Sequence, residues 1–139
     1  MLLLDTDTLT HLHAGHPNVI AHLHQADDPD IGITVITKIE LLRGRFDFVL
    51  KAATGRELLR AQYWLHRTEE LLAQILIFPI NTEAVAHFDR LRTMKQLRKI
   101  GRADMLIASI ALSHQATLVT RNRRHFQHVP ELSVTNWVD

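Results

Sequence analysis

The sequence predicts an α/β fold in which a central, mostly parallel sheet of four or five strands lies between two layers of helices. Short, continuous apolar runs, typical of strands buried on both faces, alternate with longer segments of helical periodicity. The chain has 139 residues, of which 46% are hydrophobic and 22% charged, as in ordinary globular domains. No repeat, linker or low-complexity segment divides it, so we expect a single domain over residues 1–139.

The N-terminal half is expected to contain two strands and four helices. Leu2–Leu4 is a short apolar run that indicates a buried strand, and Thr8 or Thr10 is the expected cap of a helix ending near Ala14. Pro17 suits the first turn of a second helix. The elements expected from there on are a helix over 17–26, a β-branched strand at 31–35, a helix capped by Thr37 with a weak point at Gly44, and an amphipathic helix at 55–74.

The C-terminal half continues the alternation. The apolar run 75–80 predicts a third strand, and Thr82 begins a helix expected to extend over 82–98. Gly101 separates that helix from 102–114, which is apolar on nearly every side and is therefore expected to be buried. The elements expected after it are a strand at 117–119, a polar and basic loop at 120–128, and a fifth strand at 133–135.

Composition excludes several classes of protein. The absence of cysteine rules out a disulfide framework, a thiolate zinc site and a cysteine nucleophile. No apolar run approaches the roughly 18 residues of a membrane span. The initial Met-Leu-Leu-Leu is cut short by Asp5 and has no basic residue before it, unlike a signal peptide. We therefore expect a cytoplasmic protein with no membrane contact.

The net charge of +1 is distributed unevenly. All 16 Lys and Arg residues lie between Lys38 and Arg124, and nine of them fall within 90–124, where Asp104 is the only acid. Such a basic tract either pairs with a polyanion such as nucleic acid or solvates helix faces, and charge alone leaves both readings open.

Three acids stand where chemistry is expected in this fold class, beyond the carboxyl ends of the strands. Asp5 directly follows the first strand, Glu40 lies past the second, on the first turn of its expected helix, and Asp104 is in the first turn of 102–114. Each acid alone could simply complement a helix N-terminus. Carboxylates at the edge of an apolar core, however, are rarely tolerated without a partner or a cation. Together they predict a site for Mg²⁺-assisted phosphoryl transfer or hydrolysis.

Four sequence motifs stand in order along the chain. They are LLDTD at 3–7, TKIELLRG at 37–44, GRADMLIA at 101–108, and LVTRN at 118–122 followed by Phe126. This series resembles that of PIN domains, and most closely that of the VapC-type toxins of bacterial toxin–antitoxin pairs. The likeness runs from the first strand to Trp137 and so covers effectively the whole chain.

The resemblance implies a PIN-like three-layer α/β/α fold and a Mg²⁺- or Mn²⁺-dependent ribonuclease that a cognate antitoxin protein neutralises. It carries the catalytic and metal-binding roles onto Asp5, Glu40 and Asp104. The fourth acid of many relatives falls at Asn122 or His125, neither of which is acidic here, so the chain departs from the pattern at the second metal position.

Further residues near these motifs are expected to assist. The possible supporting groups are Thr6, Asp7, Thr120 and Asn122, although helix or turn capping explains the two threonines equally well. The expected contacts to RNA phosphates are Arg121, Arg123 and Arg124, because guanidinium groups match phosphate geometry, and His125, because it lies in the same basic loop.

Two other functions compete with a nuclease. Asp5-Thr6-Asp7 after an apolar strand also resembles the signature of haloacid dehalogenase-type phosphatases, but that chemistry needs a later acidic pair. After Asp104 the only carboxylates are Glu131 and Asp139, and neither follows a strand in that way. The other alternative is a PIN-like protein that binds RNA or a partner without cleavage.

The expected partners are the RNA substrate, the antitoxin and a second copy of the chain. A homodimer is expected because the helices at 55–74 and 82–98 carry more apolar positions than one small sheet covers.

Overall fold

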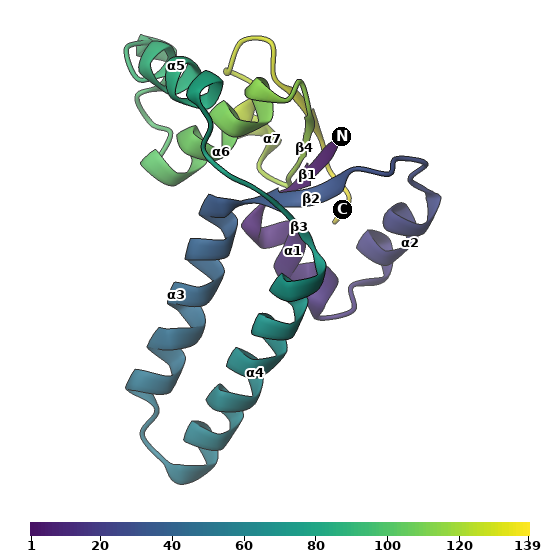
Figure 1. Ribbon diagram of the computed structural model, residues 1–139, viewed down its shortest axis with the longest axis vertical. Coiled ribbons are helices and arrows are strands. Elements are labelled where there is room, and N and C mark those ends of the chain that lie inside the picture. The colour runs from purple at the N-terminus through teal and green to yellow at the C-terminus, as the bar shows by residue number, and fades with distance from the viewer.

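The computed structural model describes residues 1–139 and contains five strands, seven α-helices and one 3₁₀ turn (Figure 1). In chain order the elements are β1 (Leu2–Leu4), α1 (Thr6–His13), α2 (Pro17–Gln25), β2 (Ile31–Thr34), α3 (Val35–Lys51), α4 (Gly55–Gln74), β3 (Leu76–Phe78), α5 (Thr82–Leu91), the 3₁₀ turn (Lys95–Leu97), α6 (Arg102–Ser113), β4 (Thr117–Val119), α7 (Arg123–Phe126) and β5 (Ser133–Thr135). The predicted α/β class and the optional fifth strand are confirmed.

The five strands form one sheet in the order β3-β2-β1-β4-β5. Every neighbouring pair is parallel, so the sheet is wholly rather than mostly parallel. β1 lies at its centre, with Leu3 opposite Gly32 of β2 and Leu4 opposite Val119 of β4. The carboxyl ends of β1, β2 and β4 therefore share one edge, where the sequence places its acids.

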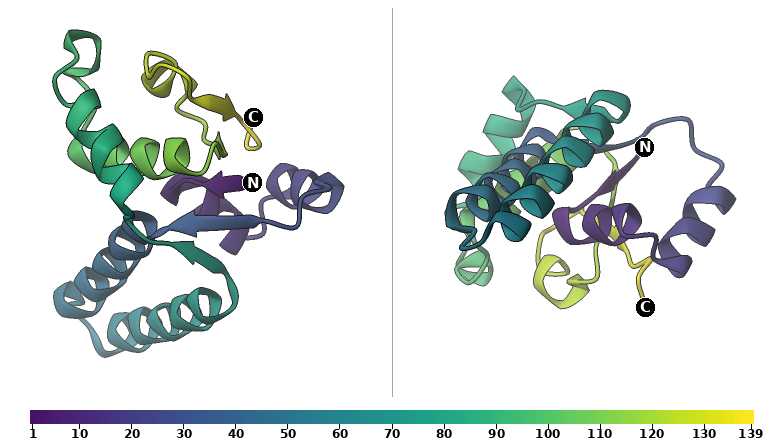
Figure 2. Two further views of the ribbon diagram at one scale, coloured as in Figure 1. Left: turned by 45° about the horizontal axis from the view of Figure 1, so that its top comes forward. Right: turned by 90° about the horizontal axis from the view of Figure 1, so that it is seen from below.

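The core is divided between the two faces of the sheet, because successive strand residues point to opposite sides. Leu3 and Leu118 belong to a cluster of 15 buried residues with α5 and α6. Leu4 and Val119 belong to a second cluster of nine buried residues that includes side chains of α1 to α4. Figure 2 shows α5 and α6 on one side of the sheet and the α3–α4 pair on the other. The expected three-layer α/β/α arrangement is confirmed.

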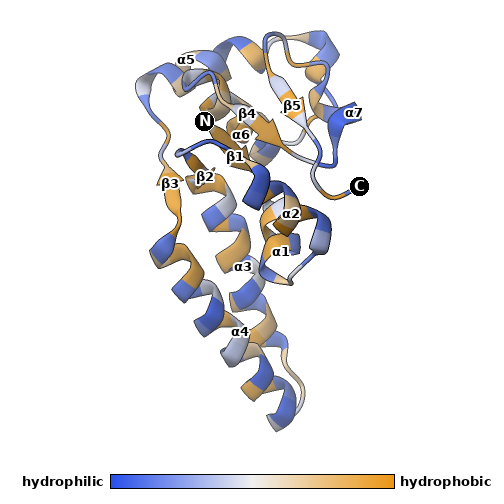
Figure 3. Cartoon of the chain, turned by 90° about the vertical axis from the view of Figure 1, so that its right-hand side faces the viewer, coloured by the Kyte–Doolittle hydropathy of each residue, from blue (hydrophilic) through white to orange (hydrophobic).

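Helices α3 and α4 project beyond the sheet as an antiparallel pair, which we call the α3–α4 hairpin (Figure 1). Apolar positions recur along both helices (Figure 3). The exposed large apolar side chains of the α3–α4 hairpin are Ile39, Phe46, Phe48, Leu50, Leu58, Leu59 and Tyr63. This surface fits the homodimer expected from the sequence, which stays a prediction.

Two helices begin earlier than expected because other residues cap them. The Asp5 carboxylate, rather than Thr8 or Thr10, caps α1 by accepting a hydrogen bond from the Thr8 backbone N–H at 2.8 Å. The Thr34 hydroxyl caps α3 and accepts from the backbone N–H of Thr37, the residue predicted to be the cap. The β-branched residues that follow Thr34 are thus helical, although their type favours a strand.

Other predicted boundaries also shift. The strand predicted at 75–80 is shorter because Pro79, which lacks an N–H, cannot extend the ladder. The helix predicted over 82–98 ends at Leu91 and is followed by the 3₁₀ turn, and the loop predicted at 120–128 contains α7. Gly44 does not interrupt α3, because a helical glycine costs only about 1 kcal/mol, which the packing of α3 on α4 offsets.

Glycine is required at position 32 by the close approach of β2 to β3. A Cβ there would lie 2.5 Å from the Leu76 carbonyl oxygen and 2.9 Å from Phe78 Cε2. Because the carbonyl belongs to the paired backbone, Gly32→Ala is expected to lower the free energy of unfolding by about 2–3 kcal/mol in urea denaturation. Gly44→Ala is the matched control: its Cβ meets open space in a helix, and a gain of about 0.5–1 kcal/mol is expected. Equal stabilities of the two variants would contradict this account.

Candidate active site

Asp5, Glu40 and Asp104 line one cavity of about 490 Å³ at the carboxyl edge of the sheet. Asp5 follows β1, and Asp104 lies in the first turn of α6 as predicted. Glu40 lies in the second turn of α3 rather than the first, because α3 begins at Val35. The complete lining is Asp5, Thr6, Asp7, Glu40, Asp104, Arg121, Asn122 and Phe126. Four carboxylates and one guanidinium thus face the same space.

Asp5 is the most enclosed of these acids, with a relative exposure of 8%. Its Oδ1 caps α1, and its backbone N–H donates to the Val119 carbonyl at 3.0 Å, which ties the residue to β4. The other carboxylate oxygen accepts no hydrogen bond from the protein. Asp5 can therefore cap α1 and bind a ligand at the same time, since Oδ1 accepts the capping hydrogen bond and Oδ2 is free.

Glu40 is oriented by a threonine of a different helix, α1. The Thr6 hydroxyl donates to Glu40 Oε1 at 2.6 Å and lies 3.2 Å from the buried hydroxyl of Thr37. This contact joins the first turn of α1 to the second turn of α3. It leaves Glu40 Oε2 as the oxygen available to a ligand.

Asp104 is a partly buried acid of the cavity whose pKa is displaced by its surroundings. Burial raises the pKa of its carboxyl above the ordinary value, His125 opposes that rise, and the negative charges of Glu40 and Asp5 add to it. The His125 ring lies beside the carboxylate, with Nε2 3.4 Å from Oδ2. A half-buried carboxylate close to two other acids belongs to a site that a bound cation would stabilise.

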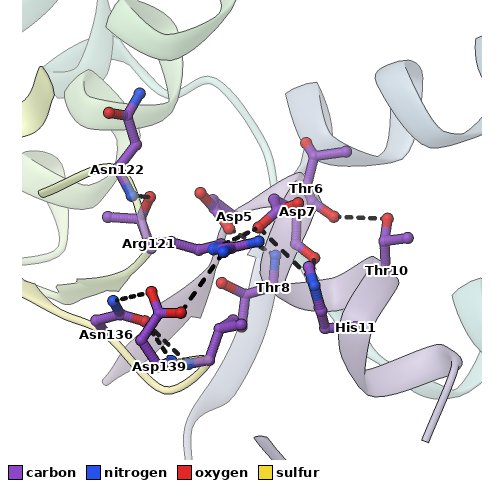
Figure 4. Close-up of polar contacts among 12 residues, drawn as sticks. Asp5, Thr6, Asp7, Thr8, Thr10, His11, Arg121, Asn122, Asn136 and Asp139 are labelled. Atoms are coloured by element: carbon purple, nitrogen blue, oxygen red, sulfur yellow. Dashed lines mark hydrogen bonds and ion pairs between the residues drawn. The ribbon is translucent and has the colours of Figure 1, made fainter. Parts of the chain in front are cut away.

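Arg121 is the only basic residue that lines the cavity. Figure 4 shows its side chain between Asp7 and Asp139. Arg121 Nε lies 4.0 Å from Asp7 Oδ2, and Nη2 lies 3.5 Å from Asp139 Oδ1. Asn122, the next residue, is exposed and also lines the cavity.

The other predicted site residues lie outside the cavity lining. Thr120 is fully buried, and its hydroxyl accepts a hydrogen bond from the Asn122 backbone N–H at 3.0 Å, so it shapes the turn after β4. Arg123 and Arg124 are exposed on α7, next to the site but not lining it. Their expected contact with RNA stays a prediction.

Sequence reasoning missed the residues that act through tertiary contacts. Thr37 supports Thr6, Asp139 contacts Arg121, and Asn136 donates to Asp139 Oδ2 at 3.0 Å. Phe126, quoted only as part of a motif, lines the cavity. Asn136 and Asp139 follow the last strand, which places them at the same edge of the sheet as Asp5, and that position was the available signal.

A larger cavity of about 610 Å³ lies within the α3–α4 hairpin, between the two helices. Basic, acidic and apolar side chains of both helices line it, with Trp64 among them. It contains none of the acids that follow the strands, so the smaller cavity is the better candidate for chemistry.

The fold and the acidic cavity agree with a comparison to known families, in which the PIN domain model matches residues 2–132. The chain belongs to the PIN-domain family. The match includes every acid of the cavity and the whole sheet except its last strand. The resemblance inferred from the four motifs is therefore confirmed.

This PIN-domain protein is similar over nearly its full length to proteins of the VapC group. Ribonuclease VapC1 of Haemophilus influenzae strain R2866 is 28% identical over 139 residues, covering 97% of this chain and 96% of that protein. The structure of VapBC2 from Rickettsia felis, bound to a DNA fragment from its promoter, matches with a TM-score of 0.78 and 27% identity over 98% of each chain. VapBC-1 from nontypeable H. influenzae matches with a TM-score of 0.80 and 26% identity over 99% of this chain and 98% of that one.

The donor set of the PIN-domain cavity fits a hard divalent cation. The free oxygens of Asp5, Glu40 and Asp104 face one space, and oxygen ligands are those that Mg²⁺ prefers. No three acidic or histidine side chains already surround a single point. Mg²⁺ keeps several waters and takes only one or two carboxylates directly, so its binding does not require such a group. No helix of the fold has both the length and the apolar character needed to cross a membrane.

Proposed function

We propose that this protein is a divalent-metal-dependent ribonuclease and the toxin of a toxin–antitoxin pair, which a cognate antitoxin protein holds inactive. The observation that carries the proposal is the cavity itself, where Asp5, Glu40 and Asp104 meet at the carboxyl edge of a PIN-domain sheet. The names of the relatives support the activity, since they are ribonucleases, and the VapBC complexes support the partner. We expect this activity in the cytoplasm, where cellular RNA is met.

The three carboxylates would hold Mg²⁺ or Mn²⁺, Asp5 and Asp104 directly and Glu40 directly or through water. When bound, the ion supplies an activated water and neutralises charge on the phosphate oxygens during hydrolysis. Thr6 keeps Glu40 turned toward the cavity through its 2.6 Å hydrogen bond. The capping bond from Thr8 fixes the Asp5 carboxylate, so the ligands are oriented before substrate arrives.

Binding without cleavage, the alternative function, is disfavoured by the same charges. A phosphodiester chain entering this cavity meets Asp5, Glu40 and Asp104, which repel it unless a cation lies between them. A module that only binds RNA gains nothing from three acids at its centre. The basic residues around the site favour RNA only when that repulsion is offset.

The function is tested by purifying the protein and incubating it with bacterial RNA with Mg²⁺, with EDTA, and with EDTA followed by excess Mn²⁺. Cleavage is expected in the first and third reactions only. Expression of the wild-type and Asp5→Asn proteins in a bacterial host, followed by mapping of new RNA ends, identifies the RNA that is cut. RNA binding that persists in every reaction without any new ends would favour the binding module.

Asn122→Asp is expected to tighten Mn²⁺ binding about tenfold or to create a second ion site. Asp5, Glu40 and Asp104 are the carboxylates that we expect to bind an ion, whereas the fourth acid of the cavity, Asp7, lies beside the Arg121 guanidinium. Asn122 supplies only a neutral oxygen at the position where an acid is expected from the family pattern. Calorimetry in the absence of RNA measures the stoichiometry. Two equally strong ions in the wild type, unchanged by the substitution, would contradict this prediction.

A further inference from the structure

Arg121 reaches the cavity wall with most of its hydrogen-bonding capacity unused. Its side chain is 45% exposed, and its two ionic contacts are loose, at 4.0 Å to Asp7 and 3.5 Å to Asp139. A guanidinium carries five N–H donors in a planar fork. These contacts use Nε and Nη2 and leave Nη1 free for a ligand in the cavity that Asp5 and Glu40 also line.

Asp139 is not a chance neighbour of Arg121, because the segment 136–139 is fixed on both sides. Asn136 Nδ2 donates to Asp139 Oδ2 at 3.0 Å, and Asn136 Oδ1 accepts from the Val138 backbone N–H at 2.9 Å. The Val138 carbonyl in turn accepts from Asn18 Nδ2 of α2 at 2.9 Å. Trp137 is buried and stacks on His22 of α2 with 5.7 Å between ring centroids. Helix α2 thus anchors the segment that presents Asp139.

The contacts of Arg121 with Asp7 and Asp139 do little for the stability of the fold, since exposed ion pairs of such length contribute little. They instead set the orientation of the Arg121 side chain. Without those contacts the guanidinium would be drawn toward the carboxylates of Asp5, Glu40 or Asp104 and would compete with a cation for them. Asp7 and Asp139 draw Arg121 toward themselves, as Figure 4 shows, and so keep its guanidinium in the cavity lining without an ion pair to Asp5, Glu40 or Asp104.

We infer that Arg121 binds a phosphate of the RNA beside the bond that is cut, and that Asp139 is a positioning residue that holds Arg121 for this contact. The inference rests on the proposed ribonuclease function and names the group that orients its substrate. A guanidinium recognises phosphate through two parallel hydrogen bonds, which a loosely held, half-exposed arginine has room to form. The segment 136–139 thereby acts on substrate affinity without touching substrate.

Whether Asp139→Asn tightens or weakens RNA binding distinguishes a simple charge effect from a positioning role. Asp139→Asn removes a negative charge near a polyanion site, so simple electrostatics predicts tighter RNA binding. A positioning role predicts weaker binding, because Arg121 loses its anchor. Asp89→Asn is the matched control, since Asp89 is an equally exposed acid paired with Arg92 at 3.4 Å on α5, away from the cavity.

The experiment measures KM and kcat on a single-stranded RNA and, in Ca²⁺ to prevent turnover, its Kd by fluorescence anisotropy. Arg121→Ala is expected to raise KM and Kd roughly 10- to 100-fold, the loss of a charge-assisted phosphate contact, with kcat within a few fold. Arg121→Lys is expected to recover only part of the affinity, since lysine cannot form the planar fork. Asp139→Asn is expected to raise both constants about threefold in the wild type, and to leave them unchanged or slightly lower in the Arg121→Ala background, where only the loss of negative charge remains.

These measurements distinguish a failure of the positioning role of Asp139 from a failure of the proposed ribonuclease function. Equal effects of Asp139→Asn in both backgrounds, or tighter binding in the wild type, would overturn the positioning role even if the protein cleaves RNA. If the wild type cleaves no RNA with Mg²⁺ or Mn²⁺, the proposed function fails, and the anisotropy cycle still decides whether Asp139 acts through Arg121. Mn²⁺ affinity gives a readout independent of RNA: it is expected to fall in Asp139→Asn, whose released guanidinium turns toward the acids, and to stay unchanged in Asp89→Asn.

Discussion

Asp5→Asn is expected to reduce RNA cleavage at least about a thousandfold while leaving the fold intact. Asn caps a helix about as well as Asp, so the hydrogen bond from Thr8 and the start of α1 survive the change. What disappears is the negative charge of the oxygen that is free for a cation. Asp5→Ala would remove the cap as well, at a cost of about 1 kcal/mol, and would mix a stability effect with the catalytic one.

Glu40→Gln and Asp104→Asn are expected to cause losses of similar size, because the three carboxylates share one cavity. Combining the substitutions should add little to the largest single loss, since residues that act as one site fail as a unit. Cleavage rates measured with saturating Mg²⁺, beside circular dichroism spectra of each variant, test both statements. Asp89→Asn, which removes the same charge from an exposed position on α5, is the control.

A variant of Asp5 or Asp104 with near-normal cleavage would remove that residue from the site. Multiplicative losses in the double variants would show instead that the acids contribute independently, which a shared cation does not allow. Loss of secondary structure in Asp5→Asn would mean that the charge of the cap, rather than its hydrogen bond, stabilises α1.

The architecture was predictable because strand burial leaves a strong signal in the sequence. Leu2–Leu4 and 117–119 are apolar runs of strand length, and both are central strands of the sheet. The caps were not predictable in the same way: Asp5 and Thr34 follow strands, and whether such a residue ends a strand or begins a helix depends on which backbone N–H its side chain reaches. The β-branched Val35 then favours a strand by type, although it begins a helix.

The acids of the site were predictable from a topological rule, and their supporting contacts were not. Parallel strands deliver their carboxyl ends to one edge, so Asp5 and Asp104 could be placed there without coordinates. Thr6 contacts Glu40 across 34 positions of sequence, and Arg121 meets Asp139 across 18. Spacing along the chain gives no sign of such pairs, because they depend on the relative placement of separate elements.

RNA affinity measured in Ca²⁺ is expected to fall roughly 50- to 300-fold between 50 and 200 mM salt. The exposed basic residues of 90–124 include Arg102 at the start of α6, whose guanidinium lies over the Phe88 ring of α5, and Arg123 and Arg124 on α7. If four to six phosphates are neutralised, the slope of log affinity against log salt is about −3 to −4, from the coefficient for single strands. Titration of a labelled RNA at four salt concentrations gives the slope directly.

The slope also tells a binding surface from a solvated one, because it counts phosphate contacts rather than net charge. Arg121→Ala combined with Arg124→Ala is expected to make it shallower by about one unit. The matched control replaces Arg56 and Arg60, two exposed arginines of α4 on the hairpin that projects away from the sheet, and should leave the slope unchanged (Figure 1). Equal changes in both double variants would mean that RNA responds only to total charge. An affinity independent of salt would assign the basic tract to solvation of the helix faces and loops that carry it.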